Sequence, residues 1–189
     1  MNFINLAAER YSLRKFSDKP IEKEKLDLVL KAGQLAPTAV NFQPQRILVI
    51  ESQPALTKLK DCTPYHFNAP MALLVCYDKA VSWKRNSDSK DNGDIDASIV
   101  ATHMMLEAAD LGLGTTWVGN FNSDMIMKLF ELPKNFVPVT LLPIGYPAED
   151  AKKHSWHSQR VPIGETVFFN DFSRWEAKEI DKAARNAHH

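Results

Sequence analysis

Two arginines and a serine recur at alternate positions near the amino terminus, in the stretch ERYSLRKF. Arg10, Ser12 and Arg14 share one face of an extended chain, and in a helix the two arginines still share a face at i,i+4. A guanidinium matches the oxygens of a phosphate or carboxylate, and a hydroxyl adds a further donor. The spacing therefore predicts an anion site, with a solvated charged face paired to Glu9 and Asp18 as the alternative.

Other familiar patterns of catalytic residues are missing from the sequence. His154 and His157 form an HxxH, but no acidic or cysteine residue stands at a ligand spacing, which argues against a zinc site. The chain has no GxSxG, GxGxxG or GxxxxGK[ST], so a hydrolase elbow, a Rossmann fingerprint and a P-loop are unsupported. No pair of carboxylates stands out as an acid/base couple. We therefore name no catalytic residue, and we expect a bound group to carry the reactivity.

The composition is that of one globular domain. The 189 residues are 44% hydrophobic and 24% charged, which suits a single domain over 1–189 with a sizeable core. The 23 basic residues balance the 23 acidic ones, so net charge gives no reason to bind nucleic acid or an anionic membrane. No signal peptide or membrane-spanning stretch is predicted. Cys62 and Cys76 form no CxxC, so we expect reduced thiols in a cytoplasmic protein, although one disulfide stays open.

Helices and strands are expected to mix without a regular βαβ rhythm, which favours an α+β fold. The patterns predict helices over 3–9, 21–36, 56–62, 94–111 and 123–132, and strands over 46–51, 71–77, 114–121 and 138–147. Pro143 suggests an edge position or a bulge in the last strand. We expect the helix over 94–111 to begin at a cap, Asp94 or Asp96, and to end at Gly112. Ser123 is expected to cap the next helix, and a polar helical tail is expected over 173–187.

Two segments raise questions that the pattern alone leaves open. The helix over 94–111 is apolar on nearly every side, so it should be buried on nearly every side, and a subunit interface is one way to achieve this. His103 within it is interpreted as a core histidine rather than a ligand. The polar stretch 78–93 is long for a connection and contains Trp83. It is either a surface loop with one anchoring aromatic or a lid.

Four segments taken together resemble the nitroreductase-like family of FMN-dependent oxidoreductases, in the right order over nearly the whole chain. The family's R-x-S-x-R, A-P-S-x-x-N-x-Q-P, G-L-G-x-x-W-x-G and I-G-Y-P motifs match Arg10–Arg14, Ala36–Pro44, Gly112–Gly119 and Ile144–Pro147. The resemblance implies a mostly antiparallel central sheet flanked by helices. It also implies an intertwined homodimer that binds FMN at the interface, with contacts from both chains.

The same resemblance assigns cofactor-binding roles to individual residues. Arg10, Ser12 and Arg160 would hold the FMN phosphate. Arg14 would lie near the ribityl chain and the N1/O2 end of the flavin, where a cation stabilises the reduced form. The residues that would reach the flavin of the partner subunit are Pro37, Thr38, Asn41 and Gln43. The residues whose backbone would cover the other face of the ring and donate toward N5 and O4 are Thr116, Trp117, Val118 and Gly119.

Three positions depart from the commonest family pattern. Thr38 keeps the hydroxyl of a frequent serine, whereas Gln45 replaces a frequent tryptophan and makes packing on the partner side less certain. Ser158 stands where a basic residue is common. Because fewer charges would then hold the phosphate, we expect weaker FMN retention during purification.

The resemblance implies an enzyme that passes hydride from NADH or NADPH, by way of FMN, to an electron-poor acceptor such as a nitroaromatic or a quinone. The stretch 78–93 is then predicted to be a lid on the acceptor side. Two alternatives remain. One is a flavin-binding module or sensor without nicotinamide turnover, and the other is a different flavin chemistry of the family, such as reductive dehalogenation or flavin fragmentation.

Overall fold

The computed structural model describes residues 2–173 and 175, which form parts of two units. The first unit spans Met1–His154 and the second spans Ser155–His189. Apart from residues 173 and 175, the helical tail expected over 173–187 lies outside the described residues. That the whole chain is a single domain stays a prediction, and each unit is described by itself.

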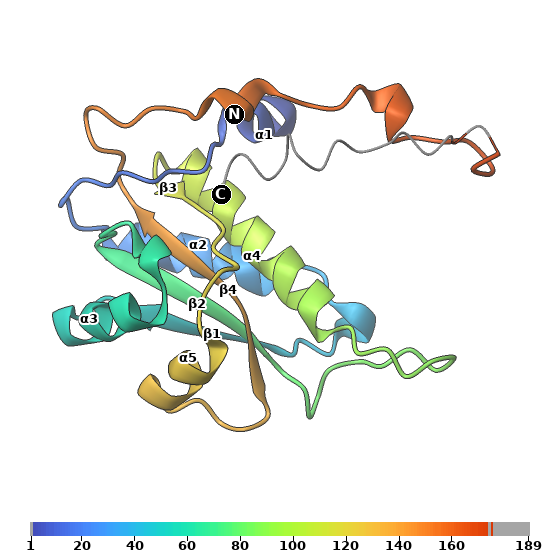
Figure 1. The fold of residues 1–189 in the computed structure, drawn as a ribbon, viewed down its shortest axis with the longest axis horizontal. Helices are drawn as coiled ribbons and strands as arrows, with labels where there is room; N and C mark the ends of the chain where they lie inside the picture. The colour runs from blue at the N-terminus through green and yellow to red at the C-terminus, as the bar shows by residue number, and fades with distance from the viewer. Residues whose placement is uncertain (1, 174, 176–189) are drawn as a thin grey trace. The chain divides into compact units, whose positions relative to one another are not determined.

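A four-stranded antiparallel sheet forms the centre of the first unit (Figure 1). The strands lie in the order β1-β2-β4-β3, with bounds Gln45–Ile50, Met71–Asp78, Phe136–Gly145 and Gly114–Thr115, respectively. All three pairings are antiparallel. The predicted α+β fold with a mostly antiparallel central sheet is confirmed.

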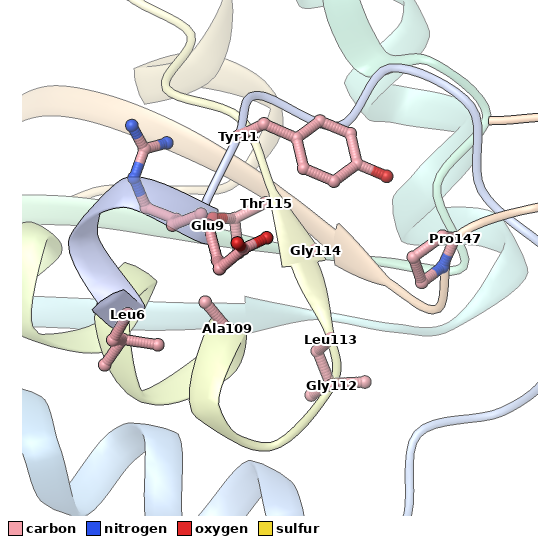
Figure 2. Close-up of a pocket in the computed structure, with 10 residues that line it drawn as sticks. Leu6, Glu9, Tyr11, Ala109, Gly112, Leu113, Gly114, Thr115 and Pro147 are labelled. Atoms are coloured by element: carbon pink, nitrogen blue, oxygen red, sulfur yellow. The ribbon is translucent and has the colours of Figure 1, made fainter. Parts of the chain in front are cut away.

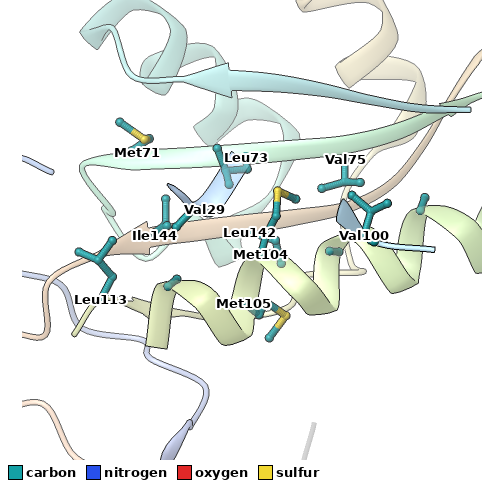
Figure 3. Close-up of a cluster of buried hydrophobic side chains, with 14 of the residues drawn as sticks. Val29, Met71, Leu73, Val75, Val100, Met104, Met105, Leu113, Leu142 and Ile144 are labelled. Carbon is teal, nitrogen blue, oxygen red and sulfur yellow. The ribbon is translucent and has the colours of Figure 1, made fainter. Parts of the chain in front are cut away.

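Helices cover both faces of this sheet. On one face lie α2 (Lys23–Leu35) and α4 (Gly93–Asp110), and on the other lie α3 (Gln53–Cys62) and α5 (Ser123–Leu129). Alternate residues of β2 therefore belong to two different cores. Leu73 lies in the cluster with α2 and α4, shown in Figure 3, and Leu74 lies in the cluster with α3 and α5. A strand covered on both faces must be apolar throughout, which explains the run MALLVCY.

Both cysteines are buried free thiols in the core that contains α3 and α5. Burial raises the pKa of the Cys76 thiol to about 12, and burial also raises the pKa of Cys62. Because the thiolate is the nucleophile, neither side chain is suited to covalent chemistry at neutral pH.

The helix ends show where the predicted caps are wrong. The N-cap of α4 is Asn92, so Asp94 and Asp96 both lie in the first turn. The helix begins earlier because Asp91 Oδ1 accepts the Gly93 N–H over 2.8 Å. Likewise, Ser123 is not the cap of α5, because the side chain of the preceding residue, Asn122, accepts the Met125 N–H. At the other end of α4 the predicted Gly112 is confirmed, with a φ of 78°.

The edge position suggested by Pro143 is wrong, whereas a bulge does occur in the last strand, β4, although it lies four residues before the proline. Strand β4 lies between β2 and β3, and its register shift places the extra residue at Val139, since Val75 pairs with Thr140 and Cys76 with Pro138. Pro143 accepts the Thr116 N–H over 3.4 Å but has no N–H to return. The ladder between β3 and β4 therefore stops at Thr115, which lets a proline sit in an inner strand.

The stretch 78–93 is a hairpin rather than an irregular surface loop. Lys84 pairs with Asp91 in an antiparallel bridge, the Asn92 N–H donates to the Trp83 carbonyl over 2.9 Å, and Trp83 is half-buried. At its base, Asp78 accepts hydrogen bonds from Asn135 and the Ala80 N–H, which lower the pKa of its carboxyl. These contacts fix the direction in which the hairpin leaves the sheet.

The described part of the second unit has two short 3-10 turns, Ser155–Ser158 and Ile163–Glu165. None of its described residues is buried, and Ile163 and Phe169 are 78% and 83% exposed. Large apolar side chains left open in this way are typical of a segment that packs against another surface. Across the described parts of the whole chain, no helix is both long and apolar enough to span a bilayer.

Candidate functional site

Residues 10–14, called the arginine segment below, form an extended stretch beside β3. Helix α1 (Phe3–Glu9) ends just before it, and the Leu13 N–H donates to the Thr115 carbonyl over 2.9 Å. Ser12 pairs with Thr115 in a parallel bridge. Leu13 is buried whereas Ser12 and Arg14 are not, so the polar side chains share the open face. Of the two geometries that the sequence allows, the structure adopts the extended one.

Gly114 permits the close approach of this segment to β3. A Cβ atom at position 114 would lie 2.3 Å from Leu13 Cδ2 and 2.8 Å from Leu13 Cβ. Real side chains do not approach so closely, so any other residue here would push the arginine segment off the strand.

A pocket of about 180 Å³ opens where α1 meets the carboxyl end of α4 (Figure 2). Leu6, Glu9 and Tyr11 lie on one side of it, and its remaining walls come from Arg10, Ala109, Gly112–Thr115 and Pro147. Cofactor pockets usually enclose about 300 to 1,000 Å³. The pocket therefore covers only part of a ligand as large as a flavin nucleotide.

The carboxylate of Glu9 in this pocket is compensated by a lysine that the sequence analysis missed. Lys153 Nζ lies 3.0 Å from Glu9 Oε2 and 5.7 Å from the centre of the Tyr11 ring. An anion that approached Arg10 would thus not meet an unpaired negative charge on Glu9. The signal available in the sequence was the basic pair at 152–153, shortly after the IGYP motif.

A hydrogen-bond network holds the carboxyl end of α4 in place. Lys25 Nζ donates to the Leu111 carbonyl and lies 2.8 Å from the Tyr146 hydroxyl, which in turn lies 2.6 Å from Glu22 Oε2. The hydrogen bond from Tyr146 is the main reason that the pKa of Glu22 falls to about 2. The lysine also complements the partial negative charge at the helix terminus. The glycine-rich wall of the pocket therefore starts from a fixed helix end.

The stretch 116–119 has two backbone donors available, not four. Thr116 and Val118 donate their N–H groups to the carbonyls of Pro143 and Leu141 in β4, and both side chains are buried. Trp117 and Gly119 are exposed, and their N–H groups have no acceptor within the described residues. Of the backbone N–H groups in this stretch, only these two are available to a bound ligand.

The segment after α2 is strained. Val40, Asn41 and Gln43 have φ values of 52°, 57° and 50°, a region that side-chain-bearing residues seldom adopt. Thr38 Oγ1 accepts the Gln43 N–H over 3.1 Å, and Gln43 Nε2 lies 3.1 Å from Asn41 Oδ1. The exposed Pro37 precedes the segment. Strain of this kind clusters at functional sites.

Asp96, a second residue that the site prediction missed, ties this segment to α4. Its Oδ1 accepts the Ala39 N–H over 2.9 Å and the Asn92 side-chain amide over 3.0 Å. The side chain is 1% exposed, and Oδ2 has no hydrogen-bond partner within the described residues. An unpaired buried polar atom costs about 1–3 kcal/mol of stability.

One chain does not bring the two groups of predicted site residues together. Ser12 lies beside Thr115, just after α4, whereas the 38–43 segment contacts Asp96 in the first turn of α4. Thirteen residues separate Asp96 from Ala109 of the pocket, and at 1.5 Å per residue this is about 20 Å. Arg160 belongs to the second unit, where its guanidinium donates to the Gln159 carbonyl, and its role beside Arg10 stays a prediction.

The outer face of α4 is open in the single chain, so burial of this helix on nearly every side, with a subunit interface as one way to achieve it, stays a prediction. A shallow groove of about 540 Å³ runs along it, lined by residues that include Ile95, Ile99, Leu106 and Phe3 of α1. Ile95 is 45% exposed. His103 is half-buried in this groove, so within the single chain it is not a core histidine.

Comparison with known proteins places the chain in a family. The model of the Nitroreductase family matches residues 7–65 and 63–146. The chain belongs to the nitroreductase family. A nitroreductase family protein from Clostridium difficile 630 is 44% identical, with a TM-score of 0.85 over 90% of this chain and 99% of that chain.

Two further relatives carry more specific names. The FMN reductase [NAD(P)H] of Bacillus subtilis is 28% identical over 89% of this chain and 75% of that protein. An FMN-dependent nitroreductase from Clostridium difficile R20291 is 29% identical, with a TM-score of 0.75 over 90% of this chain and all of that chain. In the described parts of the present nitroreductase, no group of three His, Cys, Asp or Glu side chains is placed to hold a metal.

Proposed function

We propose that this nitroreductase binds FMN and transfers hydride from NADH or NADPH to an electron-poor acceptor such as a nitroaromatic or a quinone. The observation that carries the proposal is the bridge between Ser12 and Thr115, which sets the arginine segment against the pocket at the end of α4. Family membership and the names of the two relatives support it. The proposal places the enzyme in the cytoplasm, where thiols such as Cys62 and Cys76 stay reduced.

The donors around the pocket suit FMN. Arg10 and Ser12 offer a guanidinium and a hydroxyl for the phosphate, and Arg160 of the second unit would join them. Trp117 and Gly119 offer backbone N–H groups for the polar edge of the flavin ring. The positive charge of Arg14 would stabilise a reduced, anionic flavin. Bound FMN would supply the hydride chemistry, and the protein would supply position, donors and exclusion of water.

The proposed active site takes residues from two chains. If two protomers pack α4 against α4 in antiparallel fashion, the Ser12–Thr115 end of one chain meets the 38–43 segment of the other. The point midway between Asp96 and Ala109 then lies beside the two-fold axis, close to Thr102 and His103. The open apolar groove on α4 would become the interface, and a pocket too small for FMN in one chain would be completed by the partner.

The hairpin over 78–93 is proposed as a lid on the acceptor side. Asn92 at its base and Ala39 of the strained segment share Asp96 as their acceptor, so hairpin and segment are joined at one point. A hairpin held in this way would cover the partner's flavin next to the 38–43 segment. Trp83 would supply apolar surface for a flat aromatic acceptor.

The decisive experiment is an anaerobic half-reaction. The purified protein is loaded with FMN, mixed with NADH or NADPH without oxygen, and followed by the loss of flavin absorbance. We expect bleaching in seconds with at least one coenzyme, and recovery of the colour when a nitroaromatic or a quinone is added. Free FMN with the same coenzyme is the control. A protein that binds FMN but keeps its colour would instead be a flavin-binding module, and one that binds no FMN would overturn the proposal.

A further inference from the structure

Asp96 is a buried carboxylate for which the proposed chemistry has no use. It lies in the first turn of α4, where the partial positive charge of the helix terminus favours an anion. One of its oxygens makes two hydrogen bonds and the other makes none within the described residues. Because the unpaired oxygen is destabilising, packing alone does not account for an aspartate at this position.

Asp96 is hydrogen-bonded to the start of the strained 38–43 segment. Ala39 N–H donates to Asp96 Oδ1, and the next residue, Val40, has a φ of 52° although it is β-branched. The Val40 side chain is 69% exposed, so burial of that side chain does not explain the backbone conformation. The remaining hydrogen bonds of the segment are either internal, such as the bond from Asn41 N–H to the Thr38 carbonyl, or lie at its other end, where Arg46 Nη1 of β1 donates to the Gln43 carbonyl over 3.3 Å. Asp96 therefore anchors the start of this segment, next to the strained Val40, to the rigid body of the protein.

We propose that Asp96 is a positioning residue that holds the 38–43 segment in the conformation in which Thr38, Asn41 and Gln43 meet the partner's FMN. This inference rests on the proposed function. The carboxylate touches neither the cofactor nor a reacting atom, and it acts through Ala39. Without it, the segment relaxes toward negative φ values, and the donors on it leave the flavin. Preorganisation of this kind appears as tighter binding, because the free protein already has the bound geometry.

The first test compares two aspartates in the same helical turn. Asp96→Ala removes the acceptor, and Asp94→Ala removes an exposed first-turn carboxylate that lines the groove on α4 but makes no hydrogen bond to the described 38–43 segment. We expect Asp96→Ala to weaken FMN binding by about tenfold or more in a fluorescence titration, and Asp94→Ala to stay within about threefold of wild type. Equal losses in the two variants would assign the effect to the helix dipole and overturn the proposal.

A conservative variant separates the hydrogen bond from the charge. The Asn side chain of Asp96→Asn keeps an acceptor oxygen for Ala39, so we expect FMN affinity within about threefold of wild type. If Asp96→Asn loses as much affinity as Asp96→Ala, the hydrogen bond is not the cause and the idea fails. If Asp96→Ala does not fold, Asp96→Ser replaces it, because its hydroxyl suits the start of a helix but is too short to reach Ala39.

A second readout does not depend on FMN. Hydrogen exchange of the peptide 36–45 in the cofactor-free protein reports directly on the anchor. We expect amides of this peptide to exchange about tenfold faster in Asp96→Ala than in wild type, with peptides of β2 unchanged. If the wild type binds no FMN, the proposed function fails, and the exchange result still decides whether Asp96 holds the segment. Unchanged exchange would overturn the positioning role.

Relief of strain provides the third test. Glycine adopts positive φ without the penalty that valine has, so Val40→Gly should favour the same backbone conformation without the anchor. In the Asp96→Ala background we expect Val40→Gly to restore FMN affinity by about threefold or more, and in the wild-type background to change it by less. Absence of any recovery would contradict the claim that Asp96 opposes backbone strain.

Discussion

Ser12 and Thr115 lie side by side in a parallel bridge, although 103 residues separate them in the chain. The bond from Leu13 N–H to the Thr115 carbonyl secures the bridge. The orientation of the arginine segment is thus set by a tertiary contact and not by its local sequence. Any change that separates the arginine segment from β3 should weaken cofactor binding more than it disturbs the packing of the core.

Gly114→Ala is the sharpest test of this contact. The new methyl group would meet Leu13 at well under a normal contact distance, so we expect a loss of about 1–3 kcal/mol in the free energy of unfolding, as for other overpacked sites. FMN affinity should fall by about tenfold or more, since the arginine segment moves with Leu13. Urea denaturation and a flavin titration measure the two effects.

Gly164→Ala is the matched control, because an added Cβ there meets no atom within 4 Å. We expect it to leave both measurements close to wild type. Normal FMN binding by Gly114→Ala would show that the arginine segment binds the cofactor without its close contact to β3.

Arg10→Ala should discriminate between FMN and riboflavin. A charge-assisted hydrogen bond is worth about 1.5–3 kcal/mol, so removal of the guanidinium should weaken FMN binding by about 10- to 100-fold. Riboflavin lacks the phosphate, and its affinity should hardly change. Lys31→Ala, which removes an exposed amine hydrogen-bonded to Gln34, is the control. An equal loss of affinity for FMN and for riboflavin would indicate that Arg10 does not contact the phosphate.

Much of the fold follows from local patterns in the sequence. The distribution of apolar residues locates α2, α4 and the buried strand β2. Strand β2 is easy to recognise because both faces of the sheet are covered, so nearly all of its residues are apolar. The caps are harder, since Asn92 and Asn122 compete with acidic and hydroxyl neighbours that cap equally well in isolation. Pro143 misleads because its effect depends on how far the neighbouring strand extends.

The candidate site is less accessible to sequence reasoning. Arg10 and Ser12 stand in a recognisable motif, but Asp96 and Lys153 act through contacts with residues 57 and 144 positions away. No local pattern marks such partners. The N–H groups of Thr116 and Val118 are used in the pairing with β4, whereas those of Trp117 and Gly119 stay available. This difference depends on the pairing and not on residue type.

Tyr146→Phe should change how stability depends on pH. The pKa of Glu22 falls from 4.5 to about 2, chiefly through the hydrogen bond from Tyr146 and to a smaller extent through a backbone hydrogen bond and Lys19. The stabilisation that Tyr146 contributes is therefore present above pH 4.5 and disappears as pH falls toward 2. We expect wild type to exceed Tyr146→Phe in unfolding free energy at neutral pH, with the gap narrowing below pH 4.5. Urea titrations at several pH values measure it. In a Glu22→Gln background the gap should no longer vary over this range, and a gap that persists unchanged at low pH would exclude this origin.

Trp83→Ala tests the hairpin as a lid. Loss of the indole should change the ratio of kcat/KM between a bulky and a small acceptor by roughly fivefold, because only a large acceptor would use the removed surface. FMN affinity should stay the same. Arg85→Ala, which breaks only the ion pair with Asp88 at the hairpin tip, is the control. The lid hypothesis fails if acceptor preference and both Michaelis constants match those of wild type.

Cysteines placed on α4 can locate the two-fold axis. If the helices pack in antiparallel fashion about Thr102 and His103, Thr102→Cys should form a disulfide with its own copy under mild oxidation. Ile95→Cys should not, because about 10 Å of helix separates it from the axis in each chain. Wild type, whose two cysteines are buried, gives the background on a non-reducing gel. Cross-linking at Ile95 but not at Thr102 would place the axis elsewhere.

Mixed dimers then show whether each flavin needs both chains. Arg10→Ala disables the phosphate end, and a second variant that carries Asn41→Ala with Gln43→Ala disables the segment that reaches the partner. Each homodimer should bind FMN poorly. A heterodimer of the two should recover one intact site of two, because both defects then fall in the same site and the other site is wild type throughout. We expect about half of the wild-type FMN stoichiometry, measured on differently tagged and co-purified subunits. If both halves of the site came from one chain, no subunit would carry an intact site and the heterodimer would bind no better than its parents.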